Sequence, residues 1–407
     1  MASVKSRGTQ RSSTSRKSKS QTPLEHEDYY HGLLPLEEAE SLLNEEGQFL
    51  VRHTEVEGKK LFILSAQWRA RVEHAEIYKA QNKYTFERTG ATQFDDINRL
   101  VRYHWLKKVP VGRSHLILKT PVPRQNWELN RDDIDLSGPM IGRGAYGEVW
   151  SGTLIRKGKL IPVAVKTSNV SVMTDRDIQD MLKEMSTLRR YDHKNIVKMY
   201  GVACDKQPVL IVMELMPGGS LKKYLRNKAG TTTEQERLRF CLDAAKGLSY
   251  LHRLKCIHRD IAARNCLLTD SLTVKISDFG LSLKGIEYKM KTVRKVPIKW
   301  LSIETIKHGI FNAKTDVWSF GILMWEIFSD CKEPYAGLNG LEVSCQVAEG
   351  FRLKPPPNTP TVAAELMEAC WNSEPNARPT MQRIASEIKT PGIRKRAKTP
   401  ISSAKTY

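Results

Sequence analysis

Four short motifs follow one another in a fixed order along the last two thirds of this 407-residue chain. They are a glycine-rich stretch, a strand pattern that ends in lysine, a His-Arg-Asp segment that ends in asparagine, and an Asp-Phe-Gly triplet, at 142–149, 163–166, 258–265 and 278–280. Each motif alone is weak evidence. The ordered set with suitable intervals is not explained by chance, and it constrains the fold more than any other feature.

The glycine-rich stretch predicts a loop that covers phosphate groups. Glycines let the backbone approach phosphate oxygens closely and present its N–H groups to them. Folds that bind dinucleotides use a similar string, but there a helix follows it. Here Val149 and Trp150 continue as a strand. The pattern therefore favours a β-hairpin over the phosphates.

The strand lysine, Lys166, is expected to hold the α- and β-phosphates of a nucleotide. Its partner should be an acid on the next helix, which the pattern places at 181–190, and Glu184 fits. Taken alone, either residue would be an ordinary surface charge. The two gain weight from the motifs that follow.

The last two motifs supply a base and two metal ligands. Asp260 is placed to accept the proton of a substrate hydroxyl, and Asn265 and Asp278 are placed to bind Mg²⁺, with Mn²⁺ as an alternative. Phosphoryl transfer asks for positioning and for compensation of phosphate charge rather than for covalent chemistry. This set meets that need.

On these residues the chain resembles the non-receptor protein-tyrosine kinases. The stretches 262–264 and 297–300 are similar to the tyrosine-specific branch, since serine/threonine kinases carry Lys where Ala262 stands. The resemblance implies a bilobal kinase fold, transfer of the ATP γ-phosphoryl group to tyrosine, and a role for Arg264 in orienting the substrate ring. It also implies an ATP pocket with Met213 as the residue guarding the adenine site, formed by Ile141, Gly142, Gly144, Gly147, Val149, Ala164, Glu214, Met216 and Leu267.

A smaller unit precedes this region. The pattern predicts a central antiparallel sheet with strands near 49–52, 61–64 and 72–77 and two flanking helices, 36–44 and 97–104. Arg52 ends the first strand, and a buried guanidinium is costly unless an anion such as phosphate pairs with it. The unit resembles a Src-homology 2 (SH2) domain, which implies phosphotyrosine binding by Arg52 with Thr54 and His74. The alternative is that Arg52 is a surface charge.

Several positions depart from the two families. Tyr29 stands where SH2 domains begin with Trp, Leu36 replaces a helix arginine that gives phosphate a second guanidinium, and Glu76 adds an acid near the pocket. We therefore expect weaker phosphotyrosine binding than is usual for this module. In the kinase region, Ser-Ile-Glu replaces Ala-Pro-Glu at 302–304, but Glu304 is retained and Arg378 is its expected buried partner.

The order of the two units, the linker stretch 122–129 and the stretch 141–144 look most like the Fes/Fer family. The resemblance predicts an α+β multidomain protein. The expected parts are a disordered basic tail, an SH2 domain, a linker, a tyrosine kinase domain and a second disordered basic tail, at 1–24, 29–120, 121–133, 134–389 and 390–407. The family's long N-terminal membrane-bending and coiled-coil region is not in this sequence. Membrane shaping and self-association are therefore not expected, and we expect a monomer.

Charge and cysteine usage bear on location and partners. The formal net charge is +20. Eleven lysines and arginines lie in the stretches 1–20 and 390–407, which contain no Asp or Glu. These tails are interpreted as solvated segments, with an anionic membrane surface or nucleic acid as alternative partners.

Seven cysteines without metal-site spacing predict reduced thiols. No apolar run is long enough to span a membrane, and the Met-Ala start excludes N-myristoylation. A cytoplasmic protein is expected, with recruitment to the inner face of the plasma membrane as an extension.

Two rival functions remain open at this stage. A pseudokinase scaffold would use both folds only as binding surfaces, and a nucleic-acid-binding protein is suggested by charge alone.

A regulatory site is predicted at Tyr288, which lies between Asp278 and Pro297 in a segment rich in Lys and Arg. Phosphorylation would add about −1.5 to −2 charges, which nearby cations can pair with. Arg259 is the expected partner by resemblance. Two alternatives remain: an exposed tyrosine without a role, and a basic segment that is held away from Arg259 until it is phosphorylated.

Overall fold

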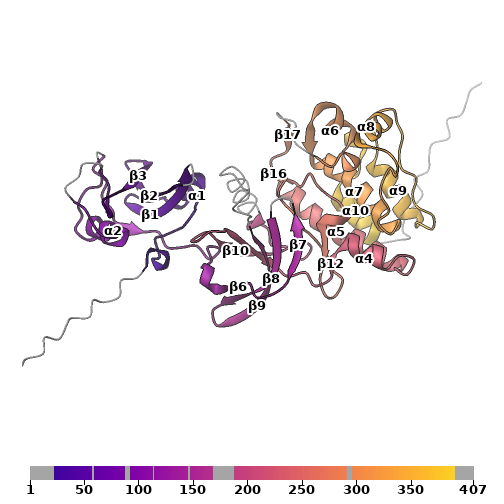
Figure 1. Ribbon diagram of the computed structural model, residues 1–407. Coiled ribbons are helices and arrows are strands. Elements are labelled where there is room, and N and C mark those ends of the chain that lie inside the picture. Colours follow the sequence, from indigo (N-terminus) through magenta and orange to yellow (C-terminus); the bar gives the residue numbers. More distant parts are fainter. Residues whose placement is uncertain are drawn as a thin grey trace, which may run out of the picture. The chain divides into compact units, whose positions relative to one another are not determined.

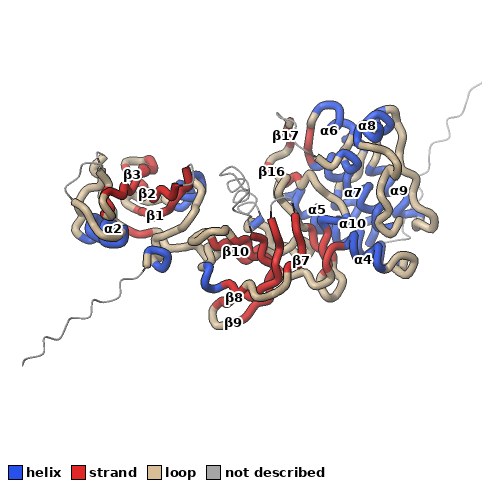
Figure 2. The backbone as a smooth tube through the Cα atoms, in the orientation of Figure 1, coloured by secondary structure: helices blue, strands red, loops and turns tan. Residues whose placement is uncertain are grey.

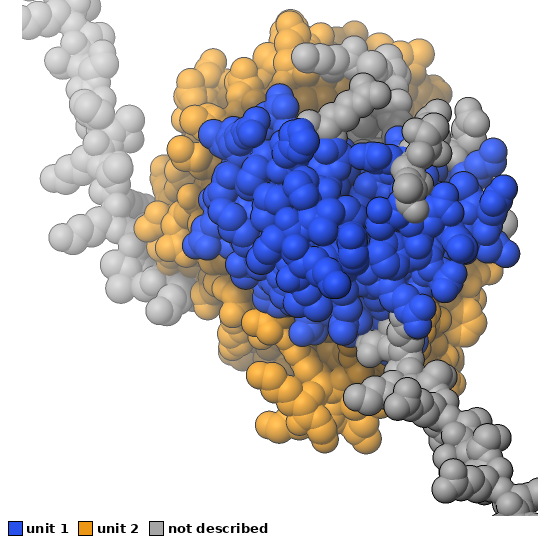
Figure 3. Space-filling view, turned by 90° about the vertical axis from the view of Figure 1, so that its left-hand side faces the viewer, with its two compact units in different colours: residues 1–124 blue, residues 125–407 orange. Residues whose placement is uncertain are grey.

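The computed structural model describes residues 23–56, 59–87, 92–112, 114–144, 147–167, 188–290 and 296–389. The chain divides into two compact units, 1–124 and 125–407, which Figure 3 colours separately. The division falls inside the segment predicted as a linker. The predicted helix at 181–190 lies almost entirely outside the described residues, and so does Glu184.

The first unit is built on a five-stranded sheet in the order β4-β3-β2-β1-β5. Figure 1 labels its strands β1, β2 and β3. Neighbouring strands are antiparallel as predicted, except that the short β5 pairs in parallel with β1. The strands are β1 (Gln48–Val56), β2 (Lys59–Trp68), β3 (Arg71–Ala80), β4 (Lys83–Thr85) and β5 (Thr120–Pro121). The helices are the 3₁₀ turn η1 (Leu24–His26), α1 (Leu36–Leu42) and α2 (Ile97–Leu106).

The two faces of this sheet carry different chemistry because side chains alternate along each strand. Phe49 and Val51 point to one face and pack with Leu100 of α2 in the core of the unit. Arg52 therefore points to the opposite face, where α1 lies. Asp96 caps α2 by accepting hydrogen bonds from the first backbone N–H groups of the helix, which fixes its start.

The second unit begins with a β lobe. Its sheet runs β10-β11-β9-β8-β6, and β7 pairs with β8 as a hairpin. The elements are η2 (Arg131–Asp133), β6 (Ile134–Asp135), β7 (Met140–Gly144), β8 (Gly147–Arg156), β9 (Lys159–Thr167), β10 (Met199–Ala203) and β11 (Leu210–Glu214). Alternating apolar residues of these strands, such as Val163, Val165 and Val212, form the core of the lobe.

A mostly helical lobe follows, and its helices are drawn in blue at the right of Figure 2. Its helices are α4 (Leu221–Asn227), α5 (Glu234–Arg253), α6 (Ile303–His308), α7 (Ala313–Phe328), α8 (Gly340–Ala348), α9 (Thr361–Cys370) and α10 (Met381–Lys389), with 3₁₀ turns η3 (Ala263–Asn265), η4 (Ile298–Trp300) and η5 (Pro375–Ala377). Its strands are β12 (Gly219–Ser220), β13 (Cys256–Ile257), β14 (Cys266–Leu268), β15 (Val274–Ile276), β16 (Leu283–Lys284), β17 (Glu287–Lys289) and β18 (Ile310–Asn312).

Helix α7 is the central element of this lobe. Almost all of its residues are buried, including Trp318 and Phe320, which is typical of a helix surrounded by protein on every side. Within the described ranges, no helix is both long and apolar enough to cross a membrane. All seven cysteines are described and free, and only Cys345 among them is exposed.

Candidate active site

The loop that carries the His-Arg-Asp motif is fixed by a buried acid of α7. The carboxylate of Asp316, which is 1% exposed, accepts hydrogen bonds from the backbone N–H groups of His258 and Arg259, both at 2.8 Å. The ring of His252 lies 3.0 Å from the same carboxylate. Arg259 has a φ of +72°, a conformation that costs free energy for a non-glycine residue. The two bonds to Asp316 offset that cost and hold the loop in place.

Asp260 is the side chain that this loop presents. A guanidinium N–H of Arg264 donates to its Oδ1, and Asn265 Nδ2 donates to its Oδ2 at 2.7 Å and to its backbone oxygen at 2.8 Å. Each carboxylate oxygen therefore has one donor, which fixes the orientation of the group. The structure brings together the predicted base, the predicted ring-orienting arginine and one predicted metal ligand.

The Asp-Phe-Gly segment is tied to the same loop. The backbone N–H and the hydroxyl of Ser277 both donate to the backbone oxygen of Asn265 at 2.9 Å. Phe279 is buried, and its ring lies 5.1 Å from that of His258. Asp278 follows directly after Ser277, so the two predicted metal ligands lie on hydrogen-bonded segments. An amide oxygen and a carboxylate are suitable for Mg²⁺, which usually takes its remaining ligands from phosphate and water.

The β lobe contributes the predicted phosphate loop and lysine. Hairpin β7–β8 pairs Gly142 with Val149 and Gly144 with Gly147, whose φ of +140° suits glycine at the hairpin tip. Two residues of the predicted loop, 145 and 146, lie outside the described ranges. Lys166 lies on β9 opposite Val149 of β8.

The predicted adenine site lies where β9, β11 and β14 provide apolar side chains. Ala164 and Met213 are direct partners across β9 and β11, and Leu267 lies on β14. The carboxylate of Glu214 is bound by Lys275 Nζ at 2.7 Å. The backbone N–H of Glu214 also donates to the backbone oxygen of Lys198 at 2.9 Å, so both its carboxylate and its N–H are paired within the protein.

Tyr288 lies on β17, opposite Phe311 of β18. The guanidinium carbon of Arg259 is 5.1 Å from the centre of the Tyr288 ring and 4.1 Å from that of Phe311. This arrangement is a double cation–π contact. In this structure the unphosphorylated tyrosine is thus not held away from Arg259, contrary to one of the two alternatives. Lys284 and Lys289 of this basic segment are described, whereas 291–295 are not.

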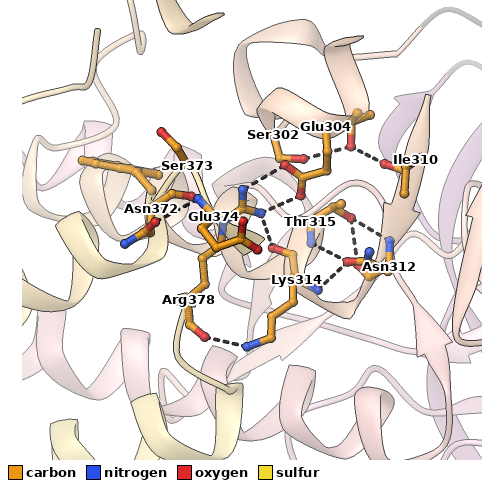
Figure 4. A network of polar contacts seen from close by, with 12 residues as sticks. Ser302, Glu304, Ile310, Asn312, Lys314, Thr315, Asn372, Ser373, Glu374 and Arg378 are labelled. Atoms are coloured by element: carbon orange, nitrogen blue, oxygen red, sulfur yellow. Dashed lines mark hydrogen bonds and ion pairs between the residues drawn. The ribbon is translucent and has the colours of Figure 1, made fainter. Parts of the chain in front are cut away.

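The substituted Ser-Ile-Glu segment keeps its predicted ion pair (Figure 4). Arg378 donates to both oxygens of Glu304, at 2.6 and 2.8 Å, and also to the backbone oxygens of Lys314 and Asn372. The guanidinium is fully buried, and it is paired by a bidentate carboxylate. The prediction that Glu304 retains a buried arginine partner is confirmed.

In the first unit, Arg52 is 6% exposed, so it is not a surface charge. Arg52 Nε donates to Ser65 Oγ at 3.3 Å, and that hydroxyl is 2.9 Å from His74 Nδ1. Burial lowers the pKa of the Arg52 guanidinium, and the carboxylate of Glu40 on α1 raises it. The strand register places Thr54 and Glu76 on the same face.

Glu40 is an acid that the sequence analysis does not single out. Its Oε1 lies 3.4 Å from His74 Nε2, on the face that carries Arg52. Leu36, at the start of the same helix, is 45% exposed and contributes no charge to the site.

Comparison with known proteins agrees with both parts of the chain. The family model for protein tyrosine and serine/threonine kinases matches residues 137–388, and the SH2 domain model matches residues 29–104. "Fer-related kinase 1" of Caenorhabditis elegans is 41% identical over 370 residues, which cover 89% of this chain and 93% of that protein. The chain belongs to the Fes/Fer family of tyrosine kinases.

Two further relatives support this assignment. "Tyrosine-protein kinase Fer" of Rattus norvegicus is 40% identical over 90% of this chain, and the match covers 44% of that protein. "Tyrosine-protein kinase transforming protein Fps" of an avian sarcoma virus is 38% identical over 90% of this chain and 68% of its own length. The chain thus spans less than half the length of the rat Fer protein.

The structure shows two positioning residues that the sequence analysis missed. Asp316 and Glu326 are both buried acids of α7, and both bind the backbone of the catalytic loop. The available signal was two carboxylates in an otherwise apolar helix. Acids are rarely buried without a partner.

Proposed function

We propose that this Fes/Fer family member transfers the γ-phosphoryl group of ATP to tyrosine residues of proteins. The observation that supports the proposal best is the arrangement around Asp260, with Arg264 on one carboxylate oxygen and Asn265 on the other. A base held in this way can accept the tyrosine proton. Arg264 stands where it can meet the substrate ring, as in the tyrosine-specific branch.

ATP with a divalent metal ion is the cofactor of the protein kinase family, and we propose Mg²⁺ here, with Mn²⁺ as a substitute. Asn265 and Asp278 are the proposed ligands, and Lys166 the proposed phosphate-binding cation, paired with Glu184. Lys166 and the metal ion held by Asn265 and Asp278 would compensate the negative charge of the ATP phosphates. Arg264 would orient the substrate tyrosine, and Asp260 would accept the proton of its hydroxyl.

The SH2 domain would bring the kinase to tyrosine-phosphorylated proteins. Buried Arg52 with Ser65 and His74 beside it supports phosphate binding there. We propose a monomeric cytoplasmic protein that is recruited to the inner face of the plasma membrane. An anionic membrane surface or nucleic acid is the proposed partner of the basic tails. We further propose domain bounds of 29–120 and 134–389.

The rival reading is a pseudokinase scaffold. Incubation of the purified chain with ATP, Mg²⁺ and a tyrosine-containing polymer separates the two, because only an active enzyme forms phosphotyrosine. Absence of phosphotyrosine, in a preparation that binds ATP and phosphopeptide, would favour the scaffold.

A further inference from the structure

Glu326 connects two segments that the chemistry requires. It lies near the end of α7, is 3% exposed, and its Oε2 accepts hydrogen bonds from the backbone N–H of Ala263 at 2.9 Å and from Trp300 Nε1 at 3.2 Å. Ala263 belongs to the catalytic loop. Trp300 belongs to η4, at the end of the activation segment. One carboxylate oxygen therefore joins the two.

The indole of Trp300 continues this connection to the base. The guanidinium carbon of Arg264 lies 4.5 Å from the centre of the Trp300 ring, and the same guanidinium donates to Asp260. The flat face of the guanidinium is thus covered by the ring while its edge holds the carboxylate. Arg264 can keep this position only if Trp300 keeps its own.

The surroundings of the Glu326 carboxyl group fit such a role. Burial raises the pKa of its carboxyl group, while the bond from Ala263, the bond from Trp300 and the nearby charge of Arg264 each lower it. A buried carboxyl is costly unless donors compensate it. The two donors to the Glu326 carboxylate come from the catalytic loop, through Ala263, and from η4, through Trp300.

We propose that Glu326 is a positioning residue for tyrosine phosphorylation, which holds Trp300 and the catalytic loop in register so that Arg264 is correctly placed between Asp260 and the substrate ring. The inference rests on the proposed function. It predicts that loss of the connection impairs use of the tyrosine substrate far more than use of ATP. Most of the proposed nucleotide-binding residues lie in the β lobe, and only the proposed metal ligand Asn265 shares η3 with Ala263.

The chain offers a matched pair of variants for the test. Trp300→Phe removes the indole N–H but keeps an aromatic ring. Trp325→Phe removes an equivalent bond, from Trp325 Nε1 to the backbone oxygen of Lys354 at 2.9 Å, close to Glu326 in sequence but without contact to the catalytic loop. We expect Trp300→Phe to raise KM for a tyrosine peptide or lower kcat by roughly tenfold, since small misplacements of catalytic groups have large effects on rate, and to leave KM for ATP unchanged. Trp325→Phe should leave all three parameters unchanged.

Substitutions of Glu326 complete the test. Glu326→Gln keeps an oxygen that can accept both bonds and should restore most of the wild-type kcat/KM, whereas Glu326→Leu keeps the bulk and should lose on the order of tenfold to a hundredfold. Hydrogen exchange of the peptide 256–266 supplies a readout that needs no activity. It should speed up in Trp300→Phe and Glu326→Leu but not in Trp325→Phe.

The outcomes separate the two proposals. An inactive wild type would reject the kinase function, and the exchange data would still decide whether Glu326 holds the loop. If Trp300→Phe behaves like Trp325→Phe in peptide kinetics and in exchange, the positioning role is wrong. Should Glu326→Leu fail to fold, the tryptophan pair decides the question alone.

Discussion

Asp260 has one donor on each carboxylate oxygen, and this decides the effect of a substitution there. Asp260→Asn would place an amide N–H₂ group against either Arg264 or Asn265, and it removes the proton acceptor. We expect tyrosine phosphorylation to fall by about 10²–10⁴-fold, the usual loss for a general base. The thermal unfolding transition of the kinase unit should change little, because Asp260 is not part of the apolar core.

Asp270→Asn is the control for this prediction. Asp270 is exposed in a turn after β14, and its Oδ1 accepts a hydrogen bond from the backbone N–H of Ser271 at 2.8 Å. The activity of the Asp270→Asn variant should equal that of the wild type. Substantial activity in Asp260→Asn, together with a normal melting curve, would remove Asp260 from the mechanism.

The phosphotyrosine pocket gives a second prediction at the same scale. Arg52→Lys should weaken phosphopeptide binding because lysine cannot form the bidentate fork. Leu36→Arg should strengthen it by adding a cation on α1, and Glu40→Gln should strengthen it by removing an acid beside His74. Calorimetry with a phosphotyrosine peptide measures all three.

Glu37→Gln is the matched control, since Glu37 lies on the same helix and is exposed. It changes the net charge of the domain equally. Equal gains in Glu37→Gln and Glu40→Gln would assign the effect to net charge, and no change in Arg52→Lys would place the phosphate elsewhere.

Residue types in motifs could be predicted, but contacts between distant segments could not. Asp260, Asn265 and Asp278 stand in short strings whose spacing carries their chemistry. Glu40 and Glu326 act across 34 and 63 residues of sequence, on His74 and Ala263 respectively. Only the fold brings such partners together, so a single sequence holds no spacing rule for them.

Among the elements, the strand pair β17–β18 determines where Tyr288 lies. Pairing with Phe311 holds the tyrosine ring against Arg259, whose Nη1 also donates to the backbone oxygen of Leu281 at 3.1 Å. A phosphate on Tyr288 would replace a cation–π contact by a charge-assisted hydrogen bond, which is stronger. The segment would then be ordered on the loop that carries Asp260.

We therefore predict autophosphorylation at Tyr288 and a several-fold rise in turnover. Tyr288→Phe keeps the ring on Arg259 and should remain at the basal rate. Mass spectrometry and initial rates during prolonged incubation with ATP measure both effects. If Tyr288→Phe reaches the wild-type rate while wild-type Tyr288 is phosphorylated, then Tyr288 is modified but its phosphorylation does not control turnover.

The type and order of the elements could be predicted better than their ends. The apolar pattern predicted a strand at 49–52, but β1 continues to Val56 because backbone pairing with β2 does not need buried side chains. Likewise α7 begins at Ala313, before its first buried residue Thr315, because Asn312 accepts hydrogen bonds from the first N–H groups of the helix. Caps and ladders extend elements beyond the hydrophobic period on which the prediction was based.

For the whole molecule, each unit has its own hydrophobic core, one around Phe49 and Leu100 and others in the kinase unit. Two such units can unfold separately, so a single melting temperature does not describe the chain. A change that affects one core should move only the transition of that unit.

Acid should destabilise the first unit through His53. This residue is 3% exposed, and its Nδ1 lies 2.8 Å from the hydroxyl of Tyr30. Burial, with smaller effects of Lys60 and Arg52, lowers the pKa of its imidazole from 6.5 to about 3. Between these values the unfolded chain binds a proton that the folded unit does not. The free energy of unfolding should therefore fall as the pH falls from 6.5 towards 3, by on the order of 1 kcal/mol per pH unit.

Denaturant unfolding of the full chain between pH 7.5 and 5 measures this slope. In His53→Gln the side chain at position 53 does not titrate in this range and still offers Tyr30 a polar partner. The unfolding transition of the first unit should therefore depend less on pH in this variant than in the wild type. His26→Asn removes an exposed histidine of the same unit and should keep the wild-type slope. Equal slopes in His53→Gln and the wild type would mean that His53 is protonated in the folded unit, and that acid acts on this unit through other groups.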